Sequence, residues 1–562
     1  MISRSWQAAL AIAAAVTVAG CAGVPDSGPV RVGRSVAAAG DGLADPTVRE
    51  VPAGPQPGAS PVQLVGGFLR AMVDSDGGYG VGRSYLAPGT AWSTGSGITV
   101  YAEPSRVVRT GRGTVVVRAR RVGEVGPHGV YRVAAGTIRR EFGVVKRAGE
   151  WRIARLDAGV LLSSDDAGRL LQPAALFFLT PDGSRLVPQP VLEAPQEPGI
   201  ATTLMRGLLA GPGPFLAPGV RTAVPKGTTL VGNVPISAAG VAEVDLSGGA
   251  RQINSVQLRR LSAQVVWTLN QLSSVTAVRL LANGAPLEAP GVPSLQPAHS
   301  WREFDPAAPS PMSGALVVRN GAVAGLGTGV PFALRGRGFV AVARSHDGSV
   351  VAAVRAAAGH QELLIGKAAG RLHRQLRDIA ITSPTFGADD SVVVATAAGH
   401  VFEVRAGMQP KRVRLAGRLK LGSIRGLAVS HDGSRVAVLV TTTAGTELDV
   451  ATVVLTDSTV SFRKPRVVLP ATADVSGVAW AEADEIVATV ARDGGPRGVV
   501  RVSADGYRLE DLSGEGLPPD VDSVAAAPQQ RVLAAAPGGT WQLVGRRWRQ
   551  VSAGVSPGYA GG

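Results

Sequence analysis

Cys21 is the only cysteine among the 562 residues of this chain, and its surroundings point to a covalent chemistry for its thiol. It follows Arg4 and a mostly apolar run over residues 8–19, which is shorter than the about 20 residues that a membrane-spanning helix needs. A charged start, a short apolar run and small residues before the cysteine are typical of a bacterial lipoprotein signal. We therefore predict a signal peptide over residues 1–20 and lipid attachment at Cys21, as S-diacylglycerol with N-acylation. A plain secretory signal and a buried core cysteine are the alternatives.

Other residues spell short patterns that occur in enzymes, but their settings argue against catalysis. Two Ser-His-Asp-Gly sequences, at 345–348 and 430–433, contain the letters of a catalytic triad. Adjacent residues of one turn rarely meet as nucleophile and base, so we predict hairpin turns there. The GVSPG sequence at 554–558 lies in a Gly/Pro-rich tail with no predicted strand or helix around it. The seven histidines lack zinc-site spacing, and we predict no catalytic residue, no metal site and no cofactor.

The formal net charge of +15 is spread over both halves of the chain. Its short arginine groups occur in alternating, strand-like sequence, which is typical of a solvated sheet face. We do not expect an exported lipoprotein of this kind to bind nucleic acid. Attraction to anionic lipid head groups or to cell-wall polymers stays open, because the anchor holds the protein near both. A single cysteine excludes an intramolecular disulfide, so stability must come from large cores.

Two α+β domains are predicted behind a tether. Residues 21–60 are dense in Gly, Pro and Ala and predict a lipidated N-terminus followed by a flexible tether. Residues 61–160 predict a helix capped by Ser60, followed by alternating runs that form a curved antiparallel sheet. The only histidine of this domain, His128, is placed in a GPHG turn. This segment is expected to have a structural or binding role.

Residues 172–297 predict the second α+β domain. It starts with a strand–turn–strand unit, and a helix that ends at Gly211 follows. The next helix is expected to begin at Asn254, with Gln257 placed to reach back to the cap. A hairpin around Asn283 and Gly284 closes the domain. We find no nucleophile, metal cluster or phosphate loop in it.

The remainder of the chain predicts an all-β propeller. A unit of strand, turn and strand recurs at spacings of 42 to 51 residues, with no helical pattern between the copies. Short strands repeated at that period are the signature of a β-propeller, here with about five or six blades over residues 312–552. Residues 298–311 are predicted to be an exposed linker, and residues 553–562 a flexible tail. The fold class is thus multidomain, with two α+β domains followed by the propeller.

The order of these parts resembles the LpqB lipoproteins of actinobacteria over nearly the whole chain. The resemblance is carried by "CAGVPDSGPV", "GEWRIARLDAGVLLS", "FFLTPDGSRLVPQPV", "LMRGLLAGPGPFLAPGVRTAVPKGT" and the degenerate propeller repeats. It implies an NTF2-like domain over 61–160 and a GerMN-like domain over 172–297. It also implies a partnership with the extracellular domain of the MtrB sensor histidine kinase, which signals to the MtrA response regulator. Only the lipidated cysteine transfers to a named position, Cys21.

Two functions compete on this basis. In the first, the protein is a non-enzymatic lipoprotein on the extracytoplasmic face of the cell membrane that modulates a sensor histidine kinase in cell-envelope signalling. Its partners would be the kinase's extracellular domain and, through Cys21, membrane lipid. In the second, it is an envelope glycan-binding protein or hydrolase that uses the propeller face. The lack of clustered acids, metal ligands and a placed nucleophile favours the first.

Overall fold

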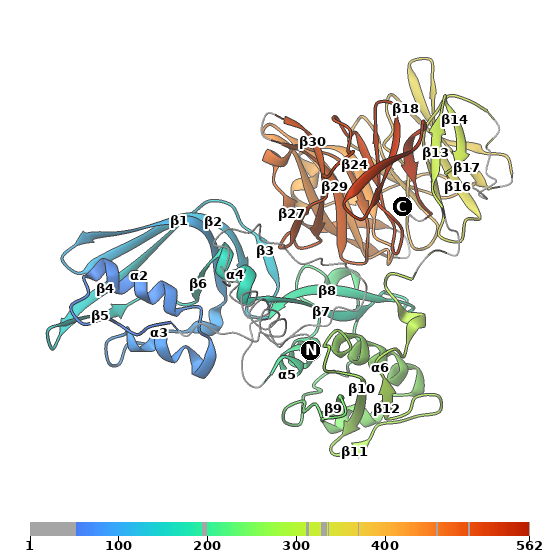
Figure 1. The fold of residues 1–562 in the computed structure, drawn as a ribbon. Coiled ribbons are helices and arrows are strands. Elements are labelled where there is room, and N and C mark those ends of the chain that lie inside the picture. Colours follow the sequence, from blue (N-terminus) through green and yellow to red (C-terminus); the bar gives the residue numbers. More distant parts are fainter. Residues whose placement is uncertain are drawn as a thin grey trace, which may run out of the picture. The chain divides into compact units, whose positions relative to one another are not determined.

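A computed structural model describes residues 52–560 apart from 194–198, 309, 311–313, 327–333, 335, 369, 457–458 and 493–494. The described residues belong to one compact unit. They form an N-terminal α+β domain, a middle α+β domain and a C-terminal β-propeller, which confirms the predicted fold class (Figure 1). The predicted signal peptide, Cys21 and most of the tether lie outside the described residues.

The N-terminal domain begins with helix α2 (Pro61–Ala71), and its predicted cap is present. The Ser60 hydroxyl accepts a hydrogen bond from the Gln63 N–H, and the Gln63 side chain accepts one from the Ser60 N–H at 2.9 Å. These two bonds satisfy backbone groups that a helix start leaves open. Phe68 lies on the inner face of α2 and is fully buried in the core of the domain.

This helix covers a mixed sheet. Its strands are β1 (Ile98–Gly111), β2 (Thr114–Val125), β3 (Tyr131–Val133), β4 (Thr137–Arg147), β5 (Glu150–Arg155) and β6 (Val160–Ser163), and the short helices α3 (Gly80–Ser84) and α4 (Ser164–Leu170) complete the domain. The strand order is β5-β4-β2-β1-β6, with β3 paired to β2. The last pair, β1 and β6, is parallel, so the prediction of a wholly antiparallel sheet is wrong at this edge. The chain crosses from β5 to the far side of β1, and β6 therefore runs in the direction of β1.

The middle domain opens with the predicted hairpin of β7 (Gln172–Leu179) and β8 (Leu186–Glu193). Its other elements are α5 (Ile200–Ala210), β9 (Val241–Leu246), α6 (Ser255–Leu269), β10 (Ala277–Ala282), β11 (Ala285–Pro286) and β12 (Leu295–Pro297). The two helices contact β7, and β9 runs parallel to β10. Asn283 and Gly284 both have positive φ, as the predicted tight hairpin turn requires.

Helix α6 begins at the predicted cap but uses Gln257 differently. The Asn254 side chain accepts the Gln257 N–H at 2.9 Å. The Gln257 amide, however, donates to the carbonyl oxygen of Ala223 at 3.2 Å instead of reaching back, so the predicted reciprocal cap is wrong. This bond engages the Gln257 side chain with the neighbouring loop and not with the helix start. The apolar stripe of the helix, which includes Leu261 and Leu269, is buried as predicted.

The propeller contains six sheets among the described residues, five of which follow one another along the chain. Blade 1 is β15 (Phe339–Arg344), β16 (Val350–Ala357), β17 (His360–Lys367) and β18 (His373–Asp378), and blade 2 is β19 (Thr385–Phe386), β20 (Val392–Ala395), β21 (Val401–Val404) and β22 (Lys411–Arg412). Blade 3 is β24 (Ser423–Val429), β25 (Arg435–Thr442), β26 (Gly445–Leu455) and β27 (Val460–Leu469), with β23 (Arg414–Leu415) added at its edge. Blade 4 is β28 (Val475–Trp480), β29 (Glu485–Arg492), β30 (Gly495–Ser503) and β31 (Leu509–Asp511), and blade 5 is β32 (Ser523–Ala525), β33 (Leu533–Ala536), β34 (Gly539–Val544) and β35 (Arg547–Ser552).

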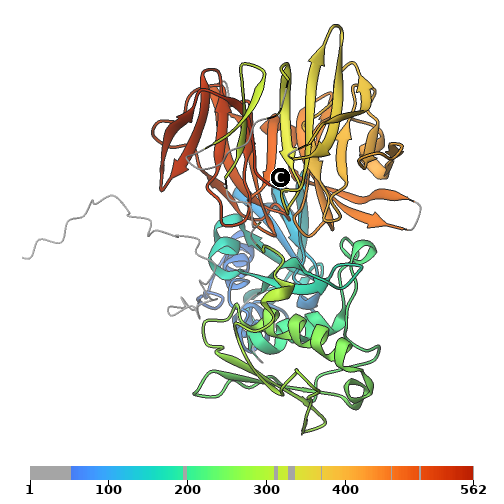
Figure 2. The same cartoon turned by 90° about the vertical axis from the view of Figure 1, so that its right-hand side faces the viewer.

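The sixth blade joins the two ends of the propeller. β13 (Leu316–Arg319) pairs with β14 (Ala322–Gly325) and with β36 (Val555–Gly558), and β36 also contacts β15 and β32. Figure 2 shows strands from both ends of this domain side by side. Residues 555–558 are therefore a strand, and the prediction of a flexible tail over 553–562 is wrong there. Tyr559 is buried behind this strand, and its hydroxyl donates to the Arg531 carbonyl at 2.7 Å.

The segment before the propeller also differs from its prediction. Residues 298–311 are not a uniformly exposed linker, because Phe304 is buried in the core of the middle domain. Trp301 packs against the same core, and its backbone carbonyl accepts a hydrogen bond from the Trp267 ring N–H at 3.2 Å. Two aromatic rings in this stretch gain more from burial than from exposure, which explains why the segment adheres to the middle domain.

Candidate functional site at the junction of the middle domain and the propeller

The two Ser-His-Asp-Gly sequences are hairpin turns, as predicted. The first joins β15 to β16, and the second joins β24 to β25. In each turn the serine hydroxyl donates to the aspartate of the same turn, Ser345 to Asp347 at 2.7 Å and Ser430 to Asp432 at 2.8 Å. Both hydroxyls are thus committed to their own turns and point to no histidine partner. This geometry closes a turn and does not activate a nucleophile.

The histidines of the two turns meet although they are far apart in the sequence. His346 Nε2 lies 3.3 Å from His431 Nδ1, and the two rings are nearly perpendicular. Burial, followed by the nearby Arg185 charge, lowers the pKa of His346 to about 4. Burial and the neighbouring His346 lower the pKa of His431 to about 4 as well. Both rings are neutral at pH 7, so they pack and exchange a hydrogen bond.

Sequence reasoning missed this pair because it judged the histidines by their spacing. The signal that was present is structural equivalence: both histidines stand at the second position of the same first hairpin, in blades 1 and 3. First hairpins of a propeller turn at the same end of the ring, so residues in equivalent turns share one face. A repeat alignment therefore predicts that the two histidines lie on the same face, but their contact across blade 2 is shown only by the structure.

Arg435 is the central side chain of the junction. It is 1% exposed and forms an ion pair with Asp432 at 2.7 Å. Its guanidinium also donates to the carbonyl oxygens of Ala483 at 2.6 Å and Pro188 at 3.1 Å, and it lies over the Trp480 ring. Pro188 belongs to β8, so this buried cation ties blade 3 to the middle domain.

The charge of Asp432 is kept by these neighbours. Burial opposes its ionisation, but the Arg435 charge and the hydroxyl and N–H groups of Ser434 outweigh burial and lower its pKa. The ion pair is therefore intact at neutral pH. Breaking a buried pair on one side leaves an uncompensated charge, which makes Arg435 an important residue for the integrity of the junction.

Further contacts hold the middle domain against blade 3. Arg185, in the β7–β8 turn, donates to the His431 carbonyl at 3.3 Å. The Thr452 hydroxyl donates to the Phe215 carbonyl at 2.6 Å, and the Arg466 guanidinium lies 3.9 Å from the centre of the Phe215 ring. Gly219 approaches so closely that a Cβ there would lie 2.5 Å from the Thr452 methyl carbon. At Gly219 the two surfaces therefore leave no room for a side chain.

The N-terminal domain also contacts the propeller. The Tyr507 hydroxyl, from the turn after β30, donates to the Ala167 carbonyl of α4 at 2.9 Å. Its ring meets the Tyr131 ring edge-on, with centroids 5.1 Å apart. Burial raises the pKa of Tyr507 to about 12, so this hydroxyl stays a donor at neutral pH. The propeller thus has ordered polar contacts with both preceding domains.

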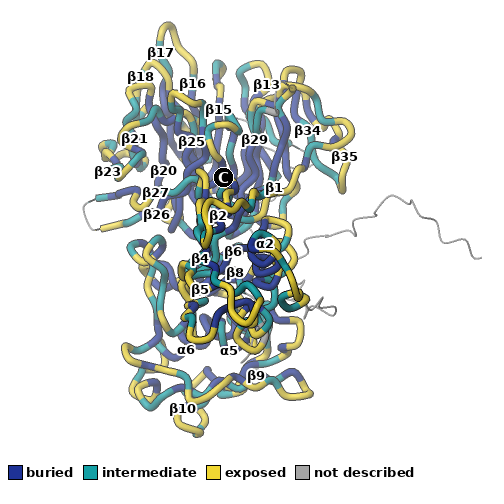
Figure 3. The backbone as a smooth tube through the Cα atoms, turned by 90° about the vertical axis from the view of Figure 1, so that its left-hand side faces the viewer, coloured by how far each residue is buried: buried dark blue, intermediate teal, exposed yellow. Residues whose placement is uncertain are grey.

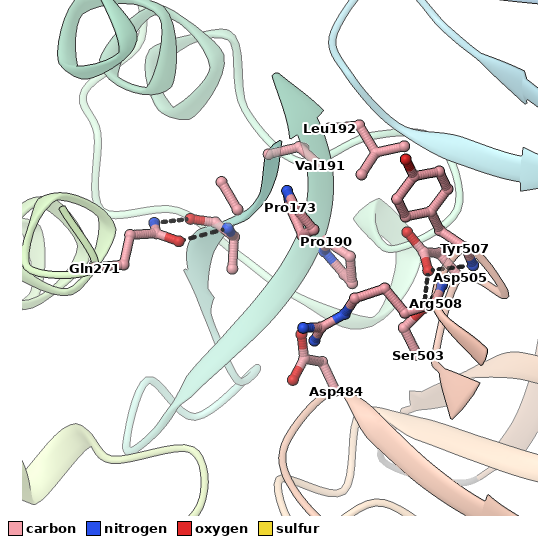
Figure 4. A pocket seen from close by; sticks show the side chains of 12 residues that line it. Pro173, Pro190, Val191, Leu192, Gln271, Asp484, Ser503, Asp505, Tyr507 and Arg508 are labelled. Atoms are coloured by element: carbon pink, nitrogen blue, oxygen red, sulfur yellow. Dashed lines mark hydrogen bonds between the residues drawn. The ribbon is translucent and has the colours of Figure 1, made fainter. Parts of the chain in front are cut away.

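A cavity of about 150 Å³ lies between the β7–β8 hairpin and the turn from Ser503 to Arg508 (Figure 4). Asp505 lies in its wall and accepts hydrogen bonds from the Ser503 hydroxyl and the Tyr507 N–H. Asp484 faces Arg508 in the same wall, and burial raises its pKa. On the opposite wall Gln271 exchanges hydrogen bonds with the backbone of Ala175. These groups stabilise the wall and do not present an activated nucleophile.

A second cavity, of about 270 Å³, lies between the β7–β8 turn and blades 2 and 3. Its lining combines aliphatic side chains and the Phe462 ring with several carboxylates. The Asp182 carboxylate accepts the Thr180 hydroxyl and the Ser184 N–H, and Asp389 pairs with Arg405. Asp182 is thus engaged in its own turn, and Asp389 is engaged by Arg405.

Within the part of the chain that the structure describes, no cluster of three or more His, Cys, Asp or Glu side chains could hold a metal ion. The same residues include no helix that is long and apolar enough to cross a membrane. Of the sequence motifs, the structure brings the two predicted turns together. It places several charged residues beside them that sequence reasoning did not single out. Cys21, the one predicted site residue, stays a prediction because it lies outside the described residues.

Comparisons with known proteins cover all three domains. A model of the N-terminal domain of lipoprotein LpqB matches residues 54–168, and a model of the LpqB beta-propeller domain matches residues 318–560. A model called Germane, described by sporulation and spore germination, matches residues 175–288.

Curated relatives extend these matches over the full length. Lipoprotein LpqB of Thermobifida fusca is 30% identical to this chain over 635 residues, and the match covers 100% of both proteins. The Rhodococcus opacus protein of that name is 28% identical over 95% of this chain and 93% of its own length. The Cutibacterium acnes protein is 34% identical over 52% of this chain, which spans about half (49%) of that relative.

Proposed function

The chain belongs to the LpqB lipoprotein family, and on that premise we propose that it is a membrane-anchored extracytoplasmic protein that modulates a sensor histidine kinase of the MtrB type. Cys21 would carry the lipid, and the residues between it and the first helix would serve as the tether. Anchoring confines the propeller to the membrane surface and raises its effective concentration around a membrane receptor. A contact of modest affinity then biases the receptor, provided that it favours one receptor state.

The observation that carries this proposal is the use of the Ser-His-Asp-Gly turns in structure. Their serine hydroxyls close the turns themselves, their histidines pack together within the propeller, and the second turn bonds to the middle domain through the His431 carbonyl and Arg435. Among the described residues, this cluster of charged and hydrogen-bonding groups therefore joins two domains. Such a joint supports a non-enzymatic scaffold that presents propeller loops in a fixed arrangement.

The binding experiment uses residues 42–562, the compact unit, and the purified extracellular domain of the cognate kinase. We expect saturable binding of modest affinity and no hydrolysis of cell-wall glycan or peptide substrates by the same preparation. Arg435→Met, which breaks the junction, is expected to bind more weakly, because the propeller loops lose their fixed arrangement. Strong hydrolysis without kinase binding would overturn the proposal and support an envelope hydrolase.

The anchor is tested separately with Cys21→Ala in cells. This variant is expected to lose acyl labelling, because the chain has no second thiol to accept the lipid. It should also alter kinase output less than the same amount of lipidated protein. Persistent acyl labelling would contradict the assignment of Cys21, while leaving the kinase contact to be judged by the binding experiment.

A further inference from the structure

One edge of the propeller carries an unusual concentration of positive charge. Residues 405–425, here called the basic edge, contain seven Lys and Arg residues, and no Asp or Glu occurs between Glu403 and Asp432. The segment includes β22 and β23, the outermost strands of blades 2 and 3. Figure 3 shows exposed chain around β23 at this edge. The seven cations are Arg405, Lys411, Arg412, Arg414, Arg418, Lys420 and Arg425.

Five of these cations are exposed and unpaired. Arg405 pairs with Asp389 and Glu403, and Arg418 pairs with Glu447 and Asp449. The other five have no carboxylate within ion-pair distance among the described residues, and all five are exposed. Their mutual repulsion is uncompensated within the chain, so this edge favours an anionic surface.

The basic edge is held in place from beneath. Val413 and Leu419 are buried in a core cluster shared by blades 2 and 3. Arg418 turns inward to the buried carboxylates of Glu447 and Asp449. Val413 stands between Arg412 and Arg414, and Arg418 and Leu419 stand between Arg414 and Lys420. The segment therefore presents its cations from a fixed backbone.

Two large apolar side chains project from the same segment. Leu421 is 90% exposed, which is the highest exposure of any large hydrophobic side chain in the described residues, and Met408 is 59% exposed. Lys420 lies directly before Leu421, and Met408 lies in the turn between β21 and β22, three residues before Lys411. Cations that protect sheet edges from other sheets explain Lys411 and Arg412, but they do not explain exposed apolar side chains beside them.

We propose that the basic edge docks the propeller on a membrane surface that contains anionic lipids. Leu421 and Met408 would enter the interface, and the five unpaired cations would contact lipid phosphates. Apolar side chains set among cations are the combination that binds such an interface, whereas a soluble polyanion gains nothing from Leu421. The 30 residues between Cys21 and residue 52 can span at most about 100 Å, so the anchor permits this contact. The inference does not depend on the kinase contact.

Blade 4 supplies a matched control. Its edge, residues 509–522, contains Leu509, which is 61% exposed, together with five carboxylates and no cation. An exposed leucine thus occurs at both edges with opposite surrounding charge. If apolar exposure alone drove membrane binding, the two leucines would contribute equally.

The experiment measures binding of residues 42–562, which lack the lipid, to vesicles of phosphatidylcholine with or without about one third phosphatidylglycerol. We expect binding to the anionic vesicles only, weakening as salt is raised. Lys411→Gln/Arg412→Gln/Lys420→Gln should reduce the partition coefficient on the order of 100-fold, because each cation contributes about fivefold. Leu421→Gln should reduce it by roughly fivefold to tenfold.

The controls are Leu509→Gln and a triple variant of equal net charge, Arg112→Gln/Arg546→Gln/Arg549→Gln, and we expect both to bind like the wild type. Equal losses from the two triple variants would show attraction by net charge alone and overturn the proposal. Equal binding to neutral and anionic vesicles, or no binding to either, would also overturn it. Binding to soluble polyphosphate but not to vesicles would make the basic edge a polymer site instead.

Discussion

The junction and the basic edge use the same residue type in opposite ways. At the junction, Arg435 is buried, paired with Asp432 and bonded to two carbonyl oxygens from other segments. At the basic edge, Arg412 and Arg414 are exposed and have no carboxylate partner among the described residues. Both regions are rich in charge. The charge of Arg435 is neutralised by a carboxylate of the same chain, whereas the charges of Arg412 and Arg414 are not.

This difference separates a structural role from a binding role. A buried cation that loses its partner leaves an uncompensated charge in a low-dielectric interior, so changes at the junction should reduce stability. An exposed cation is solvated in the free protein, so changes at the basic edge should leave stability intact and affect only a partner. Arg418 combines the two, because it lies in the basic edge and pairs with buried carboxylates.

The largest effect is expected for Arg435→Met. The substitution leaves Asp432 buried without its cation and removes the donor to Pro188 and Ala483. The free energy of unfolding should fall by about 3 to 5 kcal/mol. Denaturant unfolding measures it, with Arg412→Met at the basic edge as the control, which should stay within about 0.5 kcal/mol. Similar losses in both variants would remove the distinction between the regions.

A smaller loss is expected when the close fit of the junction is disturbed. In Gly219→Ala the new Cβ would lie 2.5 Å from the Thr452 methyl carbon and 2.6 Å from the Val453 carbonyl oxygen. Relief of this clash should cost about 1 to 3 kcal/mol and open the junction to protease. Gly168→Ala in helix α4 is the control, because no atom outside its chain neighbours and its own helix backbone lies within 4 Å of its Cβ position. Equal protease resistance of the two variants would contradict a close fit.

The histidine pair should make the junction sensitive to acid. Unfolded histidine takes up its proton near pH 6.5, whereas burial holds the pKa of His346 and His431 at about 4 in the folded chain. The unfolded state therefore binds more protons between these values, and the free energy of unfolding should decrease as pH falls from 6.5 to 4. Asp347, Asp432 and Arg185 face the pair and are unchanged in the test.

The test compares the pH dependence of unfolding of the wild type with that of His346→Gln/His431→Gln. The double variant should lose part of the slope between pH 6.5 and 4. Carboxyl groups with raised pKa, such as Glu482 and Asp449, contribute with the opposite sign in both proteins and cancel in the difference. The exposed histidines serve as control in His128→Gln/His373→Gln, and a slope change as large in that variant would contradict the assignment.

The smallest effect on stability is expected for Leu421→Gln. Its side chain is already solvated, so the free energy of unfolding should change by less than about 0.5 kcal/mol even though vesicle binding falls. Leu419→Gln, two residues earlier, places a polar amide in a core cluster and should cost about 2 to 5 kcal/mol. Thermal unfolding of the two variants checks this contrast. A large loss in Leu421→Gln would mean that the basic edge is structural.

The sequence by itself determined most of the architecture. Ser60, Asn254 and the Asn283-Gly284 turn act locally, because caps and tight turns depend on neighbours within a few residues, and the structure has all three. The repeat period likewise predicted the propeller, since a repeated pattern needs only the chain to be recognised. The predicted lipid attachment at Cys21 rests on such a local pattern too.

Only the tertiary structure decided what joins distant segments. The pairing of β36 with β13, the meeting of His346 with His431 and the reach of Arg435 to Pro188 connect residues separated by 85 to more than 200 positions. Such contacts depend on which buried groups find partners when the domains pack, and no local spacing records that. The same holds for Leu419 and Leu421: identical residues two positions apart, whose burial was settled by the fold beneath them.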